Sequence, residues 1–403
     1  MMIRTEARSR ALSSPALKLA PGNCRLLVES AVGAARKELL CSRILQYTRQ
    51  AWTMRSRSDC NRRAQEGSAI GTGSPLARKE KASLTAYVVV SSLAKLARVP
   101  QWTGLFSNEA ILLNTAFTHH ARDTLTRRLI SVLPPWLCIR AMDRWFIPGM
   151  TQHFAFRKRL CEHRLASALS SGVAPAQIII LGAGFDTLAI RMARQYPAVT
   201  FFELDLPQTQ RRKVGILADI RHSLPPNCEF VEADLAAVAL EEAMRGKASF
   251  QAGAITWVVL EGVLMYLTES EVRALFRSLR KLLTGSLTIL FGATCTSDAK
   301  GNWSLRMINA LLAKSLESTK WFCPSNSMPG FLNDLEFRLE EWMPYYKLQS
   351  AYRAEAELQN VPKEDENYYV VRKMTREESS APSRAIKEIP LIPLSPLIPL
   401  EAK

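Results

Sequence analysis

The stretch IIILGAGFDTLAIRMA, residues 178–193, decides the fold. Its uninterrupted apolar run indicates a strand buried on both faces, as in a parallel sheet. Gly182 and Gly184 then permit a sharp turn, after which apolar residues return at helical spacing. A strand, a tight turn and a helix in this order are typical of the first unit of a doubly wound α/β sheet, where the turn holds part of a ligand.

Strand-like and helix-like segments alternate after this unit. Thr268 and Glu271 form a capping box, which predicts a helix beginning just after residue 268. Two late segments, 337–346 and 366–373, predict an antiparallel pair at the sheet edge. We therefore expect an α/β fold with a Rossmann-like, doubly wound sheet. The remaining strands are expected at 177–182, 199–205, 228–235, 254–262 and 286–294, with a helix at 207–217 that has Pro207 in its first turn.

Composition divides the chain into four predicted parts. The first, rich in Arg, Ser, Ala and Gly, is a basic and disordered extension, and the last is a Pro-rich disordered tail. The second is helical, with helices expected at 84–97, 108–133 and 153–172 and with Gly172 as a C-terminal cap. These parts are residues 1–82, 83–172 (a helical cap), 173–378 (the α/β domain) and 379–403.

The net charge of +16 is unevenly distributed. Residues 1–80 carry 15 Lys and Arg against 6 Asp and Glu. Such an extension could bind RNA, DNA or anionic lipid, and it could equally be a solvated, flexible segment. We favour the second interpretation, and we do not expect nucleic acid to be a partner.

The eight cysteines and the apolar segments bear on metal, membrane and compartment. No Cys-x-x-Cys pair or adjoining His cluster is present, which argues against a zinc site and a disulfide framework. No uncharged apolar run reaches about 18 residues, so no membrane span is predicted. Reduced thiols fit a cytoplasmic location. The Arg- and Ser-rich N-terminus leaves an organellar transit peptide as the alternative.

The turn after the first strand does not fit a phosphate-rich ligand. Thr187 stands where a dinucleotide fingerprint needs its third glycine, and the Gly-Lys-Ser/Thr ending of ATPases is missing. Asp186 places an anion where a pyrophosphate would lie, so it favours a ligand with a cationic amino group.

Acidic residues end the next three expected strands. Glu203 and Asp205 lie on one strand face, and one of them could accept hydrogen bonds from both ribose hydroxyls. Asp234 could accept from an adenine amino group, with Leu235 against the ring, and Glu261 ends the fourth strand. One ribose, one adenine, one ammonium and one sulfonium suit this acidic edge, which favours S-adenosylmethionine.

Four blocks, LGAGFDTLA, FFELDLPQTQRRK, VEADL and LEGVLMYL, resemble the leucine carboxyl methyltransferase family in order and spacing. That family includes protein phosphatase methyltransferases and bacterial S-adenosylmethionine-dependent O-methyltransferases. The resemblance covers residues 150–295, with a looser fit for 83–150 and 295–375. It implies a class I methyltransferase fold with an N-terminal helical cap.

The resemblance also implies roles for individual residues. Gly182 would lie at the methionine part of the cofactor, Asp205 would hold the ribose, Asp234 and Leu235 would frame the adenine, and Glu261 would lie near the centre. Gly184 and Asp186 complete the expected cofactor site.

The family further uses an Arg before the first strand to bind the cofactor's carboxylate. Arg157 is the best match, and Lys158 and Arg159 compete with it on the same turn. A solvated basic helix face is the alternative interpretation. The family's additional basic residue near the N-terminus has no identifiable counterpart here.

Catalytic residues depend on the acceptor. Methyl transfer is a direct displacement, so a carboxylate acceptor needs no base, whereas a hydroxyl does. His153 is the candidate base that we select, with His119 and His120 as others in the cap. Glu261 and Tyr266 complete the candidate catalytic set, Tyr266 as a wall of the methyl site.

We expect O-methylation of a carboxylate or hydroxyl on a small molecule. A protein C-terminal carboxylate is an alternative acceptor, and a related branch of the family acts on modified tRNA. Three other classes remain open, namely a nicotinamide-dependent oxidoreductase, a nucleic-acid-binding protein that uses the basic N-terminal extension, and a catalytically silent protein that binds the cofactor.

Overall fold

The computed structural model describes residues 83–120, 149–236, 240–295, 319–352 and 366–379. All of them belong to one compact unit that runs from Thr72 to Lys403. The predicted N-terminal extension and nearly all of the predicted Pro-rich tail lie outside these residues. The proposed boundary at residue 172 stays a prediction.

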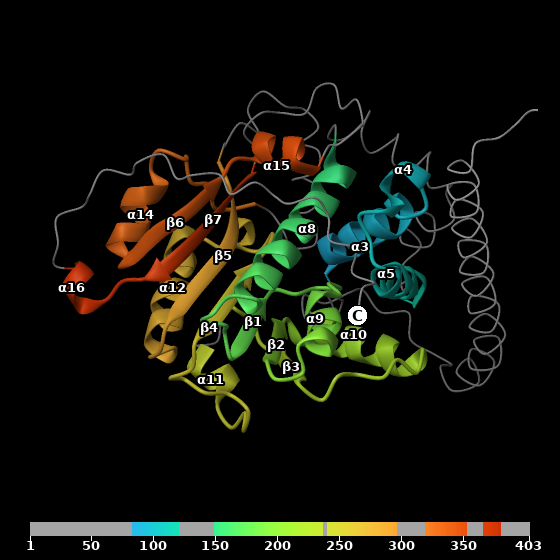
Figure 1. The fold of residues 1–403 in the computed structure, drawn as a ribbon, viewed down its shortest axis with the longest axis horizontal. Coiled ribbons are helices and arrows are strands. Elements are labelled where there is room, and N and C mark those ends of the chain that lie inside the picture. Colours follow the sequence, from blue (N-terminus) through green and yellow to red (C-terminus); the bar gives the residue numbers. More distant parts are fainter. Residues whose placement is uncertain (1–82, 121–148, 237–239, 296–318, 353–365, 380–403) are drawn as a thin grey trace, which may run out of the picture. The chain divides into compact units, whose positions relative to one another are not determined.

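Seven strands form one sheet in the order β3-β2-β1-β4-β5-β7-β6 (Figure 1). The first five are parallel, β7 runs antiparallel to β5, and β6 pairs antiparallel with β7 at the edge. The antiparallel pair predicted for the sheet edge is therefore confirmed. The strands are β1 (Gln177–Leu181), β2 (Thr200–Asp205), β3 (Cys228–Glu232), β4 (Thr256–Leu260), β5 (Leu287–Thr294), β6 (Phe337–Met343) and β7 (Glu366–Lys373).

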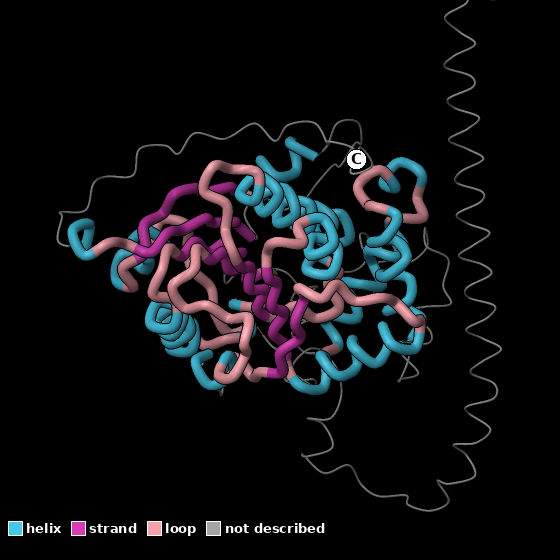
Figure 2. The backbone as a smooth tube through the Cα atoms, turned by 60° about the horizontal axis from the view of Figure 1, so that its bottom comes forward, coloured by secondary structure: helices cyan, strands magenta, loops and turns pink. Residues whose placement is uncertain are grey.

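Helices cover both faces of this sheet, which confirms the doubly wound α/β prediction (Figure 2). Period-2 alternation explains the two layers, because neighbouring strand residues point to opposite faces. Ile179 of β1 packs in the cluster with α12, while Ile178 and Ile180 pack in the cluster with α9. The helices between β1 and β5 are α9 (Leu188–Gln195), α10 (Pro207–Asp219), α11 (Leu240–Met244), the 3-10 helix η2 (Leu264–Tyr266) and α12 (Glu269–Leu282).

A third apolar cluster joins helices that precede β1 to the sheet edge. Trp102 and Phe156 meet edge to face in this cluster, with ring centroids 5.9 Å apart. The start of α3 also contacts α10, because the Ser83 N–H donates a hydrogen bond to the Thr209 hydroxyl across 3.1 Å. The other helices are α3 (Leu84–Leu96), α4 (Pro100–Thr103), α5 (Asn108–His120), α8 (Met150–Leu169), α14 (Met328–Asp334), α15 (Tyr345–Tyr352) and α16 (Arg376–Ser379).

Two helix signals are confirmed and one is wrong. The capping box of Thr268 and Glu271 opens α12, and Pro207 begins α10. Gly172, in contrast, is not the cap of α8. That helix ends at Leu169, and Ser170 caps it with right-handed backbone angles, so no glycine with positive φ is required. The predicted helix at 108–133 is described only as far as His120.

Within the part of the chain that the structure describes, no helix is long and apolar enough to cross a bilayer. The same residues include no group of three or more His, Cys, Asp and Glu side chains that could hold a metal ion. Four cysteines are described, and all four are buried free thiols: Cys161, Cys228, Cys295 and Cys323.

Candidate functional site

The glycine turn after β1 is held by its backbone and by close neighbours. Gly182 has φ +67° and donates its N–H to the Leu204 carbonyl across 2.8 Å. A Cβ at this position would lie 2.2 Å from a methyl of Val263. Gly184 has φ +54°, and its Cβ would lie 2.9 Å from the Cβ of Ala86 in α3. Both glycines are therefore required by conformation and by close packing. Their contact with a ligand stays a prediction.

Asp205 ends β2 directly beside this turn. Its carboxylate accepts the N–H of Gly184 across 2.6 Å and the N–H of Leu206 across 2.7 Å. Burial raises the pKa of Asp205, and the two N–H donors oppose that rise. A carboxylate offers about four lone-pair positions, so it can accept further hydrogen bonds from a ligand.

Glu203 lies deeper in the protein than Asp205. Its side chain is fully buried and forms an ion pair with Lys213 of α10, which is also fully buried. Burial raises the pKa of Glu203 to about 7, although Lys213 acts in the opposite direction. Of the two acids at the end of β2, Asp205 is the one that meets the glycine turn.

A chain of ion pairs connects α8 to the ends of β4 and β7 and to the glycine turn. We call it the strand-tip cluster, and it consists of His153, Arg157, Lys158, Asp186, Glu261 and Glu366. The contacts are His153 Nε2 to Glu366 Oε2 at 2.6 Å, Glu366 Oε2 to an Arg157 Nη at 3.7 Å, Arg157 Nε to Glu261 Oε1 at 2.6 Å, Glu261 Oε2 to Lys158 Nζ at 2.9 Å, and Lys158 Nζ to Asp186 Oδ2 at 2.7 Å. These side chains are only 5% to 18% exposed.

Burial and pairing act against each other in the pKa values of this cluster. Burial alone would raise the pKa of Asp186, but the ion pair with Lys158 outweighs it and lowers that pKa to about 2. For Glu366, the hydrogen bond and charge of His153 and the charge of Arg157 overcome burial and also lower the pKa to about 2. Both carboxyl groups are therefore ionised at neutral pH.

Glu261 has close cations but no well-aligned hydrogen bond. Both of its carboxylate oxygens are buried and, among the described residues, lack a hydrogen-bond partner, as does Nε of Arg157. The 2.6 Å and 2.9 Å contacts are therefore charge contacts with poor donor geometry. Because buried polar atoms are normally hydrogen-bonded, the Glu261 oxygens have unused capacity for a ligand that carries N–H or O–H donors.

The strand-tip cluster includes several of the residues predicted from the sequence. Of the three basic residues on one turn of α8, Arg157 and Lys158 lie in it, whereas Arg159 pairs with Glu162 across 2.9 Å. Tyr266, half-buried at the end of η2, is near enough to contribute to the raised pKa of Arg157.

Other predicted residues lie outside the cluster. Asp234 and Leu235 follow β3 and are half-buried, and Asp234 accepts the Ala236 N–H across 3.0 Å. His119 and His120 end α5, and His120 lies 3.9 Å from Asp219 of α10. The cluster brings His153 together with the acids but does not include the His119–His120 pair.

Sequence reasoning did not select Glu366 or Gly262. Gly262 has φ +65°, and a Cβ there would meet the Arg157 guanidinium at 3.1 Å. The sequence feature that could have indicated Gly262 is the Glu-Gly pair at the end of β4. Glu366 is the first residue of β7, and its signal was an acid at the start of a strand predicted to be antiparallel. Such a strand begins where the parallel strands end.

Comparison with known proteins shows that part of this chain is similar to one family of methyltransferases. Residues 113–280 match the family model described as leucine carboxyl methyltransferase. This confirms the resemblance read from the sequence blocks. The matched segment includes the predicted site residues from His153 to Tyr266, and Glu366 lies beyond it. The sheet order with a reversed seventh strand is that of the class I methyltransferase fold, as the resemblance implied.

One curated relative and two solved structures illustrate the similarity. A candidate S-adenosyl-L-methionine-dependent methyltransferase of Bacillus subtilis (strain 168), YktD, is 29% identical over 140 residues, which are 34% of this chain and 43% of that protein. The chain therefore matches less than half the length of this relative. A structure described as a methyltransferase candidate from Thermobifida fusca YX is 16% identical, with a TM-score of 0.47, over 65% of this chain and 94% of its own. A DUF574 family protein from Streptomyces avermitilis MA-4680 is 13% identical, with a TM-score of 0.46, over 64% and 95%.

Proposed function

We propose that this protein is an S-adenosylmethionine-dependent methyltransferase that methylates an oxygen atom of a small molecule. The observation that carries the proposal is the family match over residues 113–280, because that segment holds the glycine turn and the acids that end β2 and β4. An edge rich in carboxylates and without a phosphate cradle suits a cofactor that carries an ammonium and a sulfonium.

The side chains at the strand ends fit this cofactor. The two Glu261 oxygens, which accept no hydrogen bond from the residues that the structure describes, can accept one from an ammonium or a hydroxyl. The Asp205 carboxylate can accept from ribose hydroxyls beside Gly184. In this proposal, Arg157 holds the cofactor's carboxylate, Asp186 and Glu261 face its ammonium, Gly182 and Gly184 lie along its methionine part, and Asp234 and Leu235 frame its adenine.

The protein's own contribution is orientation and exclusion of water. S-adenosylmethionine supplies, when bound, an electrophilic methyl group on a positively charged sulfur. The ion pairs fix Arg157, Lys158 and Glu261 relative to one another, which reduces the reorganisation needed to align an attacking oxygen. Tyr266, on the turn after β4, is the proposed wall beside the transferred methyl group.

Calorimetric titration of the full chain tests the cofactor. We expect S-adenosylmethionine to bind with a micromolar dissociation constant, and Asp205→Asn to weaken it roughly tenfold through lost hydrogen bonds to the ribose. Asp219→Asn, at a largely exposed position on α10, is the matched control and should bind as the wild type does.

The same titration distinguishes the other function classes. Binding of a nicotinamide cofactor in place of S-adenosylmethionine would contradict the proposal and favour an oxidoreductase. Binding of S-adenosylmethionine without formation of S-adenosylhomocysteine on any acceptor would favour a silent cofactor-binding protein. Methylation of a peptide C-terminus would indicate that the acceptor is a protein C-terminal carboxylate and not a small molecule.

We also propose a cytoplasmic location, supported by the buried free thiols of Cys161, Cys228, Cys295 and Cys323. Imaging of a C-terminally tagged full chain tests it. Accumulation in an organelle would instead support the transit-peptide interpretation of the N-terminus.

A further inference from the structure

The pair formed by His153 and Glu366 stands out at the end of the strand-tip cluster. His153 lies in the first turn of α8, and Glu366 begins β7, 213 residues later. His153 Nε2 and Glu366 Oε2 are 2.6 Å apart, and the two side chains are 12% and 10% exposed. A contact this short between buried polar groups fixes the orientation of the imidazole ring.

The ionisation of Glu366 decides which ring nitrogen carries the proton. A carboxylate only accepts hydrogen bonds, so the nitrogen facing it must be an N–H. The lowered pKa of Glu366, caused by its contacts with His153 and Arg157 acting against burial, keeps it ionised. In the neutral ring, Nε2 therefore bears the hydrogen and Nδ1 keeps its lone pair. Glu366 thus holds His153 in the form that accepts a proton at Nδ1.

The pair adjoins the proposed cofactor site through Arg157. His153 and Arg157 are four residues apart on α8, so they lie on the same helix face. A guanidinium nitrogen of Arg157 is 3.7 Å from the Glu366 carboxylate, and Arg157 Nε is 2.6 Å from Glu261. The Arg157 charge is thus shared between two carboxylates, which leaves Glu366 able to stabilise an imidazolium at His153.

Aromatic rings surround His153. The Tyr345 ring meets the imidazole edge to face, with centroids 4.6 Å apart, and the rings of Phe154 and Tyr368 lie at 6.2 Å and 6.5 Å. These rings are themselves buried, so a ligand group that reaches the imidazole meets aromatic surroundings, which favour an acceptor with an aromatic body. Among hydroxyl acceptors, a phenol has a pKa of about 10, far closer to that of imidazole than an aliphatic alcohol has.

From this geometry we propose that His153 is a catalytic base and Glu366 its positioning residue, and that the methyl acceptor is a phenolic hydroxyl. This inference rests on the proposed methyltransferase function. The phenolic O–H bond breaks and its proton goes to Nδ1 of His153. The oxygen forms the new bond to the methyl carbon as the carbon–sulfur bond breaks, with its electron pair passing to sulfur. S-adenosylhomocysteine leaves, and the imidazolium returns its proton to water.

The tautomer is tested without any acceptor. The full chain has five histidines, which can be labelled with nitrogen-15 and observed by NMR at about pH 9, where a typical imidazole is neutral. The signal that disappears in His153→Gln belongs to His153. We expect the Nε2–H form in the wild type. Glu366→Gln should shift it toward the Nδ1–H form, because the amide can donate to Nε2. An Nδ1–H form in the wild type would overturn the proposal.

Turnover tests the base itself, with 4-methylphenol, 4-nitrophenol and benzoate as probes and S-adenosylhomocysteine formation as the readout. For 4-methylphenol, His153→Gln should lower kcat by roughly 10²-fold to 10⁴-fold, the usual contribution of a general base. Glu366→Gln should also lower kcat, by up to roughly 10⁴-fold, because it permits the wrong tautomer. His163→Gln, ten residues later on α8, is the matched control and should leave turnover unchanged.

Acceptor acidity separates a base from a structural histidine. At about pH 8 most 4-nitrophenol is already ionised, so the loss in His153→Gln should be much smaller for it than for 4-methylphenol. Equal losses for both phenols would overturn the role of His153. Methylation of benzoate but of neither phenol, or of no probe at all, would overturn the phenolic acceptor. Calorimetric binding of S-adenosylmethionine by the same protein would still uphold the proposed cofactor in each of these cases, and its absence would remove the proposed function.

Discussion

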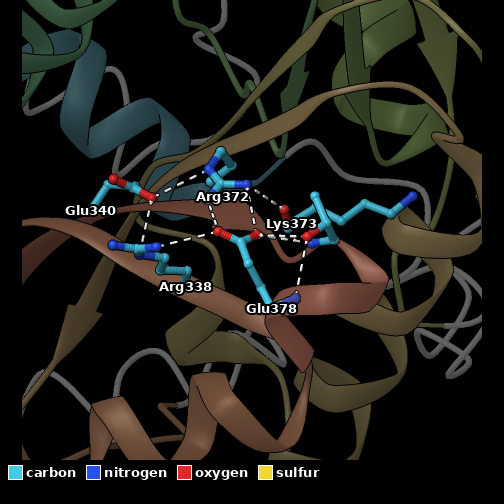
Figure 3. Close-up of polar contacts among 6 residues, drawn as sticks. Arg338, Glu340, Arg372, Lys373 and Glu378 are labelled. Atoms are coloured by element: carbon cyan, nitrogen blue, oxygen red, sulfur yellow. Dashed lines mark hydrogen bonds and ion pairs between the residues drawn. The ribbon is translucent and has the colours of Figure 1, made fainter. Parts of the chain in front are cut away.

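Two groups of ion-paired side chains in this protein differ in how deeply they are buried. The strand-tip cluster is buried at the carboxyl ends of β1 and β4. The second group, which we call the edge-strand cluster, consists of Arg338, Glu340, Arg372 and Glu378 on β6, β7 and α16, with side chains 30% to 56% exposed (Figure 3). Arg372 bonds Glu378 across 2.7 Å, as closely as Lys158 bonds Asp186.

Depth gives these similar contacts different consequences. The pKa of Glu378 is lowered to about 2, mainly by the hydrogen bond from Arg372, and the pKa of Glu366 reaches a similar value inside the protein. Water and salt screen the exposed pair, so little of that interaction becomes stability. In the buried cluster, removal of one partner leaves a buried charge with neither a counter-charge nor water. The free energy of unfolding then falls far more than it does when an exposed pair is broken. The comparison teaches that the buried ion pairs hold the strand ends together, whereas the exposed ion pairs add little to the free energy of unfolding.

Removal of one buried carboxylate should have the largest effect. Glu261→Gln keeps the side-chain size but leaves Arg157 and Lys158 with less counter-charge. We expect the free energy of unfolding to fall by about 3–5 kcal/mol, measured by urea denaturation. The control Glu340→Gln in the edge-strand cluster should lower it by less than about 1 kcal/mol. Equal losses would contradict the distinction between the two clusters.

Acid should weaken the strand-tip cluster next. Asp186 and Glu366 have folded-state pKa values of about 2, below the ordinary 3.8 and 4.5. The folded-state pKa values are lower than the ordinary ones, so each carboxylate contributes roughly 2–3.5 kcal/mol to the free energy of unfolding above about pH 4.5. This contribution is lost as the pH falls toward about 2. Urea unfolding at pH 7, 4.5 and 3 measures this loss. Glu366→Gln should lose less stability over that range than the wild type, and parallel profiles would refute the assignment.

Two glycines with positive φ differ in how closely neighbouring atoms pack against them. Gly182 and Gly246 both have positive φ, but a Cβ at Gly182 would overlap Val263, while one at Gly246 would meet none of the described atoms within 4 Å. Alanine at Gly246 should cost about 1–2 kcal/mol for the left-handed conformation alone. Gly182→Ala should cost about 1–3 kcal/mol more, because packing must shift. Chemical denaturation of the two variants measures the difference, and similar losses would show that the glycine turn is loosely packed.

Salt should have the smallest effect, confined to the edge-strand cluster. Glu378→Gln should lower Tm by no more than about 2 °C at low salt, and the difference from the wild type should shrink as NaCl rises toward about 0.5 M, where charges are screened. For Glu366→Gln the difference should persist at high salt. A salt-resistant effect of Glu378→Gln would indicate that this carboxylate is shielded from water.

Local signals made most of the fold predictable. A continuous apolar run marked β1, and the Thr268–Glu271 box marked the start of α12, because each of these signals lies within a few consecutive residues. Gly172 misled the prediction of the α8 end, since glycine permits a left-handed cap without requiring one.

The site was less predictable, because its contacts join distant segments. Arg157 and Glu261 could be selected from their motifs, but the contact between Glu366 and His153 depends on where β7 begins relative to β4 and α8. The depth of Glu203 was equally hidden. Alternation places it on the same strand face as Asp205, but only the packing of Lys213 against it shows that it is inside the protein.

The reversed direction of β7 has a consequence for how this protein could diversify. The segment matching the family ends at residue 280, and Glu366 reaches the parallel strand ends from a later part of the chain. The part proposed to hold the cofactor and the part that orients His153 are thus separate stretches of sequence that meet at one edge. Substitutions at the start of β7 could change which acceptor is used while the segment that matches the family model stays intact.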